Sequence, residues 1–423
     1  MTSSKNYILS ISIIGVLFFM FGYVTWQNGA LIPFFKLACE LKSNSEALLV
    51  TFAFYIAYFF LSIPSSFILN KTGYKRGMSI GLVIMAIGAL LFLPAAQKRD
   101  FNFFLTGLFI QAAGMALLQT ACNPYISVIG PIESATKRMS IMGIFNKAAG
   151  VLSPVILSAI VLKGASGFQA KVTNATDEVM RNQLLQELSN RVMTPYIIMA
   201  VVLLTLAVMI WFSPLPEIES NSSDASDNSQ SNMKNSIFQF PHLLLGSLCI
   251  FLYVGAEVMA GDVIGLYGQS MGMSLDETKT FTSYTLISMV VGYVIGIVII
   301  PKYLKQDMAL RICALLGIVF VTLAFFTHGY ASIFFIAMLG LANSLMWPAI
   351  FPLAIEGLGR FTKIGSAFLV MGIVGGAALP QVYARLAESM HFQTAFFYCV
   401  LPCYLYILFY AMKGHNVGKA VAK

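Results

Sequence analysis

Charged residues are scarce in this chain. Asp, Glu, Lys and Arg together make up only 10% of the 423 residues, whereas 58% are hydrophobic. A soluble domain carries about 25% charged residues, so the composition excludes a soluble fold. The formal net charge of +8 comes from basic residues that stand singly between apolar runs. Because they form no concentrated basic surface, we expect no nucleic-acid partner.

Histidine and cysteine are also few, and neither forms a pattern that supports catalysis. The four histidines are far apart in the sequence, at His242, His328, His391 and His415. The six cysteines lack metal-binding spacing, and all but Cys39 fall inside apolar runs, where they read as small packing residues. No nucleophile stands beside a base. We therefore expect no enzyme activity, no bound metal and no cofactor.

Long apolar runs are what the chain has instead. A transmembrane helix needs about 20 consecutive apolar residues, and twelve stretches qualify. They are 8–35, 47–69, 77–96, 103–129, 139–162, 194–213, 242–268, 281–300, 309–327, 331–355, 364–386 and 393–412. The sequence therefore predicts an all-α membrane protein with twelve transmembrane helices.

The runs fall into two similar halves. A proline followed two residues later by isoleucine (Pro124 and Pro348), a Thr-Lys pair and a Met-Gly-Ile triplet recur in the same order in both halves; Pro124 and Pro348 are 224 residues apart, and the spacing of the other motifs differs by a few residues. This echo favours duplication into six-helix halves at 1–214 and 241–423, joined by a linker at 215–240. Residues 215–236 are polar and acidic, a composition that stays flexible. Between the fifth and sixth runs, 164–193 contains a helix-like stretch from Thr176 to Arg191, which we expect to form an external cap.

The distribution of Lys and Arg predicts the orientation in the membrane. With the N-terminus inside, the cytoplasmic loops and ends receive fifteen basic residues and the outside receives ten. Cytoplasmic loops of membrane proteins carry the excess of Lys and Arg. Both termini and the linker are therefore expected in the cytoplasm.

Twelve helices, a duplicated half and a central linker resemble the major facilitator fold. The loop between the second and third helices strengthens the resemblance, since it is similar to the basic signature of that superfamily. Its candidate gating residues are Lys71, Gly73, Lys75 and Arg76. Asn70 stands where the superfamily usually has an acidic residue, which implies a gating contact that is weaker or built differently.

Polar side chains inside the apolar runs mark the candidate binding site. A lysine at the centre of a membrane helix costs about 3 kcal/mol or more, and buried amides need partners. The residues concerned are Gln27, Asn28, Gln119, Asn123, Asn146, Lys147, Tyr253, Glu257, Asp262, Asn343, Trp347 and Gln381. Two other interpretations stay open: single amides can hold membrane helices together, and Lys147 with Glu257 can form a pair that only neutralises charge.

The chemistry of this set favours a neutral ligand rich in hydroxyl groups. Amides donate and accept hydrogen bonds at once, which suits sugar hydroxyls. Trp26, Tyr253 and Trp347 offer apolar faces for a pyranose ring. A dedicated anion site would need several cations, and Lys147 is alone in the set.

Three motifs resemble the fucose permease and glucose/galactose transporter family. They are LQTACNPY at 118–125, YVGAEV at 253–258, and MWPAIFPLAIEGLG at 346–359 followed by MGIVGG at 371–376. The resemblance implies cation-coupled uptake of hexoses by alternating access through a bacterial inner membrane. It also implies that the helices carrying Gln27, Asn28, Gln119, Asn123, Tyr253, Asn343 and Trp347 line a central cavity. A bound sugar, the lipid bilayer and no protein partner are expected, with the protein acting as a monomer.

The sequence departs from this family at two positions linked to coupling. Gly29 follows Asn28 where fucose permease has an acidic residue, and Gln119 stands where it has a glutamate, as in the glucose/galactose branch. Glu257 and Asp262 are the carboxylates that remain inside the membrane. We predict that Glu257 is the coupling group and Lys147 its partner, with Asp262 as the rival.

Several alternatives stay open at this stage. The sequence leaves undecided whether the coupling ion is a proton or sodium, and which hexose is carried. A non-transporting sugar sensor and an uncoupled facilitator on the same fold both remain possible.

Overall fold

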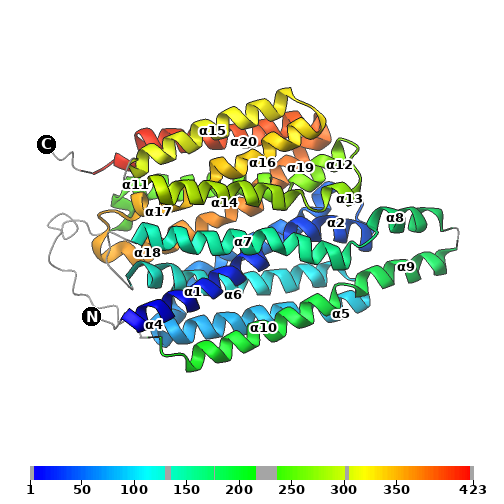
Figure 1. Ribbon diagram of the computed structural model, residues 1–423, viewed down its shortest axis with the longest axis horizontal. Helices are drawn as coiled ribbons and strands as arrows, with labels where there is room; N and C mark the ends of the chain where they lie inside the picture. Colours follow the sequence, from blue (N-terminus) through cyan, green and yellow to red (C-terminus); the bar gives the residue numbers. More distant parts are fainter. Residues whose placement is uncertain (1–3, 129–134, 176, 216–235, 301–303, 420–423) are drawn as a thin grey trace.

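The computed structural model describes residues 4–128, 135–175, 177–215, 236–300 and 304–419, and Figure 1 presents its ribbon. Every regular element within these residues is helical. Twelve spans are long and apolar enough to cross a membrane, from Leu9–Ala38 to Phe392–Met412. The prediction of an all-α protein with twelve transmembrane helices is confirmed.

The first six spans form the N-terminal half. Its helices are α1 (Ser4–Thr25), α2 (Asn28–Ala38), α3 (Asn44–Ala47), α4 (Leu49–Leu90), α5 (Phe92–Lys98), α6 (Phe101–Val128), α7 (Ala135–Val161), α8 (Ala165–Asn174), α9 (Glu178–Asn190) and α10 (Met193–Phe212).

The last six spans form the C-terminal half. Its helices are α11 (Pro241–Gly261), α12 (Ile264–Ser270), α13 (Leu275–Thr278), α14 (Phe281–Ile299), α15 (Gln306–Phe326), α16 (Gly329–Asn343), α17 (Met346–Ile355), α18 (Thr362–Met371), α19 (Gly375–Ser389) and α20 (Phe392–Met412), with 3-10 turns η2 (Ile237–Gln239), η3 (Gly359–Phe361), η4 (Gly372–Val374) and η5 (Gly414–Asn416).

The helices lie roughly along one direction and give the molecule two distinct ends (Figure 1). The described ends of the chain, Ser4 and Lys419, lie at one end, which we call the termini end. Helices α8 and α9 project at the opposite end, which we call the hairpin end. Of the predicted linker, residues 216–235 lie outside the described residues, so its flexibility stays a prediction.

Three of the breaks between helices lie near the boundary of the two halves. The first span breaks at Trp26 and Gln27, between α1 and α2; the seventh breaks at Asp262 and Val263, between α11 and α12. These breaks stand at corresponding positions of the two halves. In transporters built from repeats, such paired interruptions place helix ends at the binding site. The tenth span breaks at Ser344 and Leu345, between α16 and α17.

The candidate gating loop is a sharp turn inside α4 at the termini end. Gly73 has φ 76° and ψ 170°, a left-handed conformation that glycine adopts without a steric penalty. The turn lies at the start of the span Lys71–Lys98, which follows the span Leu49–Leu69. Nearby, the Arg76 guanidinium lies 5.7 Å from the ring centroid of Trp211 on α10. A gating role for Lys71, Gly73, Lys75 and Arg76 stays a prediction.

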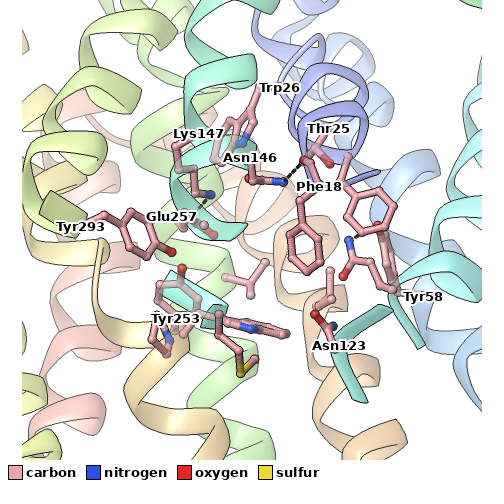
Figure 2. A pocket seen from close by; sticks show the side chains of 18 of the residues that line it. Phe18, Thr25, Trp26, Tyr58, Asn123, Asn146, Lys147, Tyr253, Glu257 and Tyr293 are labelled. Atoms are coloured by element: carbon pink, nitrogen blue, oxygen red, sulfur yellow. Dashed lines mark hydrogen bonds and ion pairs between the residues drawn. The ribbon is translucent and has the colours of Figure 1, made fainter. Parts of the chain in front are cut away.

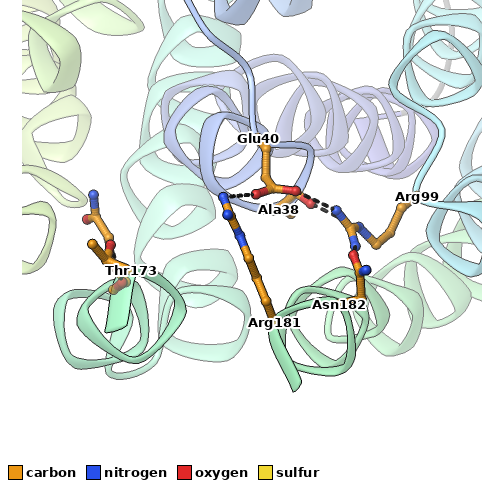
Figure 3. Close-up of polar contacts among 7 residues, drawn as sticks. Ala38, Glu40, Arg99, Thr173, Arg181 and Asn182 are labelled. Atoms are coloured by element: carbon orange, nitrogen blue, oxygen red, sulfur yellow. Dashed lines mark hydrogen bonds and ion pairs between the residues drawn. The ribbon is translucent and has the colours of Figure 1, made fainter. Parts of the chain in front are cut away.

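Several hydrogen bonds tie the projecting hairpin to the rest of the N-terminal half, and two arginines meet at one carboxylate. Glu40 accepts hydrogen bonds from Arg99, at 3.2 Å, and from Arg181 on α9 (Figure 3). Arg99 also donates to the Ala38 carbonyl and to Asn182 Oδ1, both at 3.2 Å. The predicted helix in this loop is α9, which begins at Glu178, and α8 precedes it.

Candidate functional site

A cavity of about 130 Å³ lies between the two halves, near the middle of the bundle (Figure 2). Helices α1, α4, α6 and α7 line it from the N-terminal half, and α11, α14, α17 and η4 line it from the C-terminal half. The lining residues are Phe18, Phe21, Thr25, Trp26, Tyr55, Tyr58, Gln119, Asn123, Met139, Gly143, Asn146, Lys147, Tyr253, Val254, Glu257, Tyr293, Trp347, Pro348 and Ile373.

Three of the predicted amides line this cavity from the N-terminal half. Gln119 and Asn123 are four residues apart on α6, which places both on one face of the helix. Gln119 donates a hydrogen bond of 3.0 Å to the Tyr58 hydroxyl. Asn146 on α7 donates a longer bond of 3.4 Å to the Phe18 carbonyl. Gln119 and Asn146 therefore use their side-chain nitrogens in these bonds and offer acceptor oxygens at the cavity wall.

Aromatic rings face the amides from the C-terminal half. Tyr253 on α11 and Trp347 on α17 have ring centroids 6.5 Å apart, and both residues line the cavity. Trp347 also stacks on Phe351, at 5.7 Å between centroids. The cavity thus combines an amide wall with an aromatic wall.

An ion pair crosses the cavity between the two halves. Lys147 Nζ on α7 donates to Glu257 Oε1 on α11 at 2.8 Å, and the two side chains are only 9% and 10% exposed. The ammonium also lies 4.4 Å from the centroid of the Trp26 ring. The expectation that Glu257 and Lys147 come together is met by this geometry, and their role in coupling stays a prediction.

Four predicted binding residues lie away from the cavity. The side-chain oxygen of Gln27 accepts a 2.9 Å hydrogen bond from the Tyr196 hydroxyl, inside the N-terminal half. Asn343 accepts a 2.9 Å bond from the Tyr404 hydroxyl, inside the C-terminal half. Gln381 donates to the Ser45 carbonyl at 3.4 Å, at the hairpin end. Asn28 is fully buried at the start of α2.

The helix breaks explain part of this placement. Asn343 and Trp347 belong to one predicted membrane run, 331–355, but not to one helix. The break at Ser344 and Leu345 lies between them, so Asn343 ends α16 and Trp347 lies in the first turn of α17. Trp347 lines the cavity, whereas Asn343 binds Tyr404.

Tyrosines form a part of the cavity wall that the sequence did not single out. Tyr55 and Tyr58 lie three residues apart on α4, and Tyr293 lies on α14. The available signal was the spacing of two hydroxyl groups in an otherwise apolar helix. A buried amide or charge indicates a functional site more strongly, because its burial costs more free energy, whereas tyrosine is also common in apolar cores.

Asp262, the second candidate for coupling, is buried outside the cavity. Its side chain is 1% exposed and lies beyond the end of α11. Glu257 and Asp262 are five residues apart in the sequence, which is roughly 7.5 Å along a helix. Asp262 therefore occupies a separate place, nearer the hairpin end.

Comparisons with known proteins agree with this architecture. A family model described as the Major Facilitator Superfamily matches residues 12–380. The chain belongs to this superfamily. It is 33% identical to a glucose/galactose transporter of Brucella abortus (strain 9-941), over 98% of this chain and 96% of the relative. It is 30% identical to the L-fucose-proton symporter of Escherichia coli K12, over 91% and 88% of the two chains.

A solved structure extends the likeness to three dimensions. The chain matches the crystal structure of the transporter FucP in the outward conformation with a TM-score of 0.76 and 27% identity, over 97% of this chain and 99% of that one. Membership of the Major Facilitator Superfamily confirms the predicted fold and family. It also confirms that the protein is a multi-pass membrane transporter and not an enzyme.

Proposed function

We propose that the protein is a secondary active transporter that takes up a hexose through a bacterial inner membrane. One observation carries the proposal: the cavity between the halves joins an amide wall, at Gln119, Asn123 and Asn146, to an aromatic wall, at Tyr253 and Trp347. The names of the two sugar-transporting relatives support the same substrate class.

The cavity has about the size of a bare six-membered ring, so a hexose with its hydroxyl groups requires it to widen. An engineered protein cavity of about 150 Å³ accommodates benzene, a six-membered ring, and this one measures about 130 Å³. The amides exchange hydrogen bonds with hydroxyl groups, and the rings of Tyr253 and Trp347 cover the apolar face of a pyranose. A disaccharide would require the cavity to open further.

The contacts between the halves support alternating access with the hairpin end facing outward. Ser45 donates to Glu388 at 2.7 Å, and Ser283 donates to the Val151 carbonyl at 2.8 Å, both nearer the hairpin end than the cavity. The excess of basic residues on the loops of the termini end favours the cytoplasm for that end. On this orientation the structure has its outer end closed.

Coupling is proposed to run through the Lys147–Glu257 pair. A proton or a sodium ion on Glu257 competes with the ammonium for the carboxylate. Lys147 is then released to donate to the sugar, so that cation and sugar strengthen each other's binding. The relative named as an L-fucose-proton symporter supports a proton as the coupling ion. Neither step needs a cofactor or a second copy of the chain.

The experiment is uptake of radiolabelled hexoses into liposomes that contain the purified protein. We expect at least one hexose to accumulate against its gradient when a proton or sodium gradient is imposed. Collapse of the gradient should abolish accumulation and leave sugar-for-sugar counterflow. Accumulation that never exceeds equilibrium would indicate an uncoupled facilitator. Binding without counterflow would indicate a sensor and contradict the proposal.

A further inference from the structure

A second group of polar side chains lies at the boundary of the two halves; it begins at the cavity wall with Trp26 and continues beyond the cavity. It consists of Trp26, Asn28 and Asp262, which are 2%, 0% and 1% exposed. Within the described residues, five side-chain atoms of this group have no hydrogen-bond partner: Trp26 Nε1, Asn28 Nδ2 and Oδ1, and both oxygens of Asp262. Buried polar groups in proteins are nearly always bonded, so this concentration calls for an explanation.

The group lies where the two broken helices meet. Asn28 begins α2, directly after the break in the first span, and Asp262 follows α11, at the break in the seventh. The Asn28 side chain and the Gly29 N–H face the Asp262 carboxylate and favour its charged form, but neither lies within hydrogen-bonding geometry of its oxygens. Asn28 belongs to the N-terminal half and Asp262 belongs to the C-terminal half. The surroundings of the Asp262 carboxylate therefore change when the two halves separate at these helix breaks.

Close packing seals the group from water. A Cβ added at Gly29 would lie 2.1 Å from Thr282 Oγ1, so the α2 backbone touches α14 directly. Thr282 in turn donates a 2.8 Å bond to the Gly261 carbonyl, next to Asp262. Gly261 packs on the Trp26 ring, with 2.4 Å from its added Cβ to the nearest ring carbon. No room remains here for a hydrated carboxylate while the halves stay closed.

The balance of charge around Asp262 requires a proton. The titratable groups that face it are Glu257 on α11, Lys147 on α7 and Tyr55 on α4. Lys147 already neutralises Glu257 at 2.8 Å. An ionised Asp262 would leave a net negative charge in a dry interface, which costs several kcal/mol, and the Asn28 side chain and the Gly29 N–H offset only part of that cost. Protonation removes that charge.

We propose that Asp262 is a proton-binding latch, which is protonated while the hairpin end is closed and ionises when that end opens. This inference rests on the proposed function only in assuming that the halves open alternately. The latch is separate from the Lys147–Glu257 pair that faces the cavity.

The sign of the pH dependence follows from this assignment. The closed form binds a proton that the open form releases, so acid favours closure. As the pH rises, the closed form is lost. For one linked proton, the ratio of closed to open molecules falls by at most about tenfold per pH unit.

The test is the distance between two spin labels across the hairpin end, measured without sugar. Lys42→Cys, before α3, and Ser389→Cys, the last residue of α19, place one exposed label on each half. The background is Cys39→Ser, because the other five cysteines are buried. In nanodiscs at pH 5 we expect a single short distance. At pH 9 a longer distance should dominate.

Two substitutions decide which carboxylate is responsible. Asp262→Asn keeps the shape and removes the titration, so it should hold the short distance at both pH values. Glu257→Gln makes the same chemical change on the same helix and should keep the dependence on pH, whatever its baseline distance. The proposal would be overturned if the distance in Asp262→Asn depended on pH as it does in the wild type. It would also be overturned if the dependence on pH were lost in Glu257→Gln but not in Asp262→Asn. A distance in the wild-type protein that responds to sodium at fixed pH, and does not respond to pH, would also overturn the proposal.

A second readout covers the case in which Asp262→Asn does not fold. Infrared difference spectra of the wild-type protein between pH 5 and pH 9 should contain a protonated-carboxyl band that disappears on opening. Asp262→Glu should shift that band. An unshifted band, or none, contradicts the latch. Since neither measurement uses sugar, the latch can fail while hexose uptake stands, and uptake can fail while the latch stands.

Discussion

Lys147 Nζ and Glu257 Oε1 lie 2.8 Å apart across the boundary between the two halves of the bundle. The pair is nearly inaccessible to solvent, and the ammonium also faces the Trp26 ring at 4.4 Å. Removing one partner of a buried ion pair costs about 3–5 kcal/mol, because the other charge is left unpaired. Any step that separates the halves at this level must therefore offer both groups new partners. A bound sugar and a coupling cation are suited to that task.

The first prediction concerns the carboxylate of this pair. Glu257→Gln keeps a hydrogen-bond acceptor for Lys147 and removes the group that binds the cation. In liposomes, accumulation of sugar against its gradient should disappear while sugar-for-sugar exchange survives. A variant that still concentrates sugar would show that Glu257 is not the coupling site. Asp262 would then be the candidate for the coupling site, or coupling would involve no carboxylate.

The second prediction concerns the amide wall. Gln119→Ala should weaken sugar binding by about 1–3 kcal/mol, because the sugar hydroxyl loses a buried partner. Calorimetry of the purified protein measures this change. Gln111→Ala is the matched control, since Gln111 lies on the same helix, is buried and contacts Met199 instead of the cavity. Equal affinities in the two variants would contradict a role for Gln119.

The third prediction uses the three tryptophans of the chain. Trp26 and Trp347 line the cavity, whereas Trp211 lies on α10 beside Arg76. Sugar binding should therefore change the fluorescence of Trp26 or Trp347. Trp211→Phe should keep the sugar-induced change, and the double variant Trp26→Phe, Trp347→Phe should lose it. The reverse pattern would place the sugar outside this cavity.

The fourth prediction concerns the side of the membrane that the hairpin faces. A cysteine at Val179, which is 62% exposed on α9, should react with an impermeant maleimide in intact cells. A cysteine at Lys413 should react only after lysis. Native Cys39 gives little background, because burial raises the pKa of its thiol to about 12 and leaves little reactive thiolate near neutral pH. Protection at position 179 together with labelling at 413 would reverse the orientation.

The membrane spans could be predicted from the sequence because each is a long apolar run. The predicted run 364–386, for example, corresponds to the span Ile364–Ser389. The breaks were not predicted. The run 242–268 reads as one continuous helix, yet α11 ends at Gly261 and α12 begins at Ile264. Apolar composition gives the length that crosses the membrane, whereas a break depends on packing against the other half.

The candidate site was predictable where a polar residue and its helix face agreed. Gln119 and Asn123 share one face of α6, and both line the cavity. Gln27 and Asn343 are equally polar and lie in equally apolar runs, but Tyr196 and Tyr404 satisfy them within their own halves. Sequence alone shows that a buried amide needs a partner. It does not show whether that partner is a ligand or a tyrosine on a neighbouring helix.

The contacts of Glu40 with Arg99 and Arg181 have a practical consequence for imaging. Most of a transporter of this size is hidden inside a nanodisc, and its two similar halves make particle orientations hard to separate. Here Arg99 and Arg181 fix the α8–α9 hairpin on the N-terminal half, and the C-terminal half carries no equivalent helical hairpin among its described residues. The hairpin is therefore a built-in fiducial mark, which allows electron-microscopy images to be aligned without an added antibody fragment.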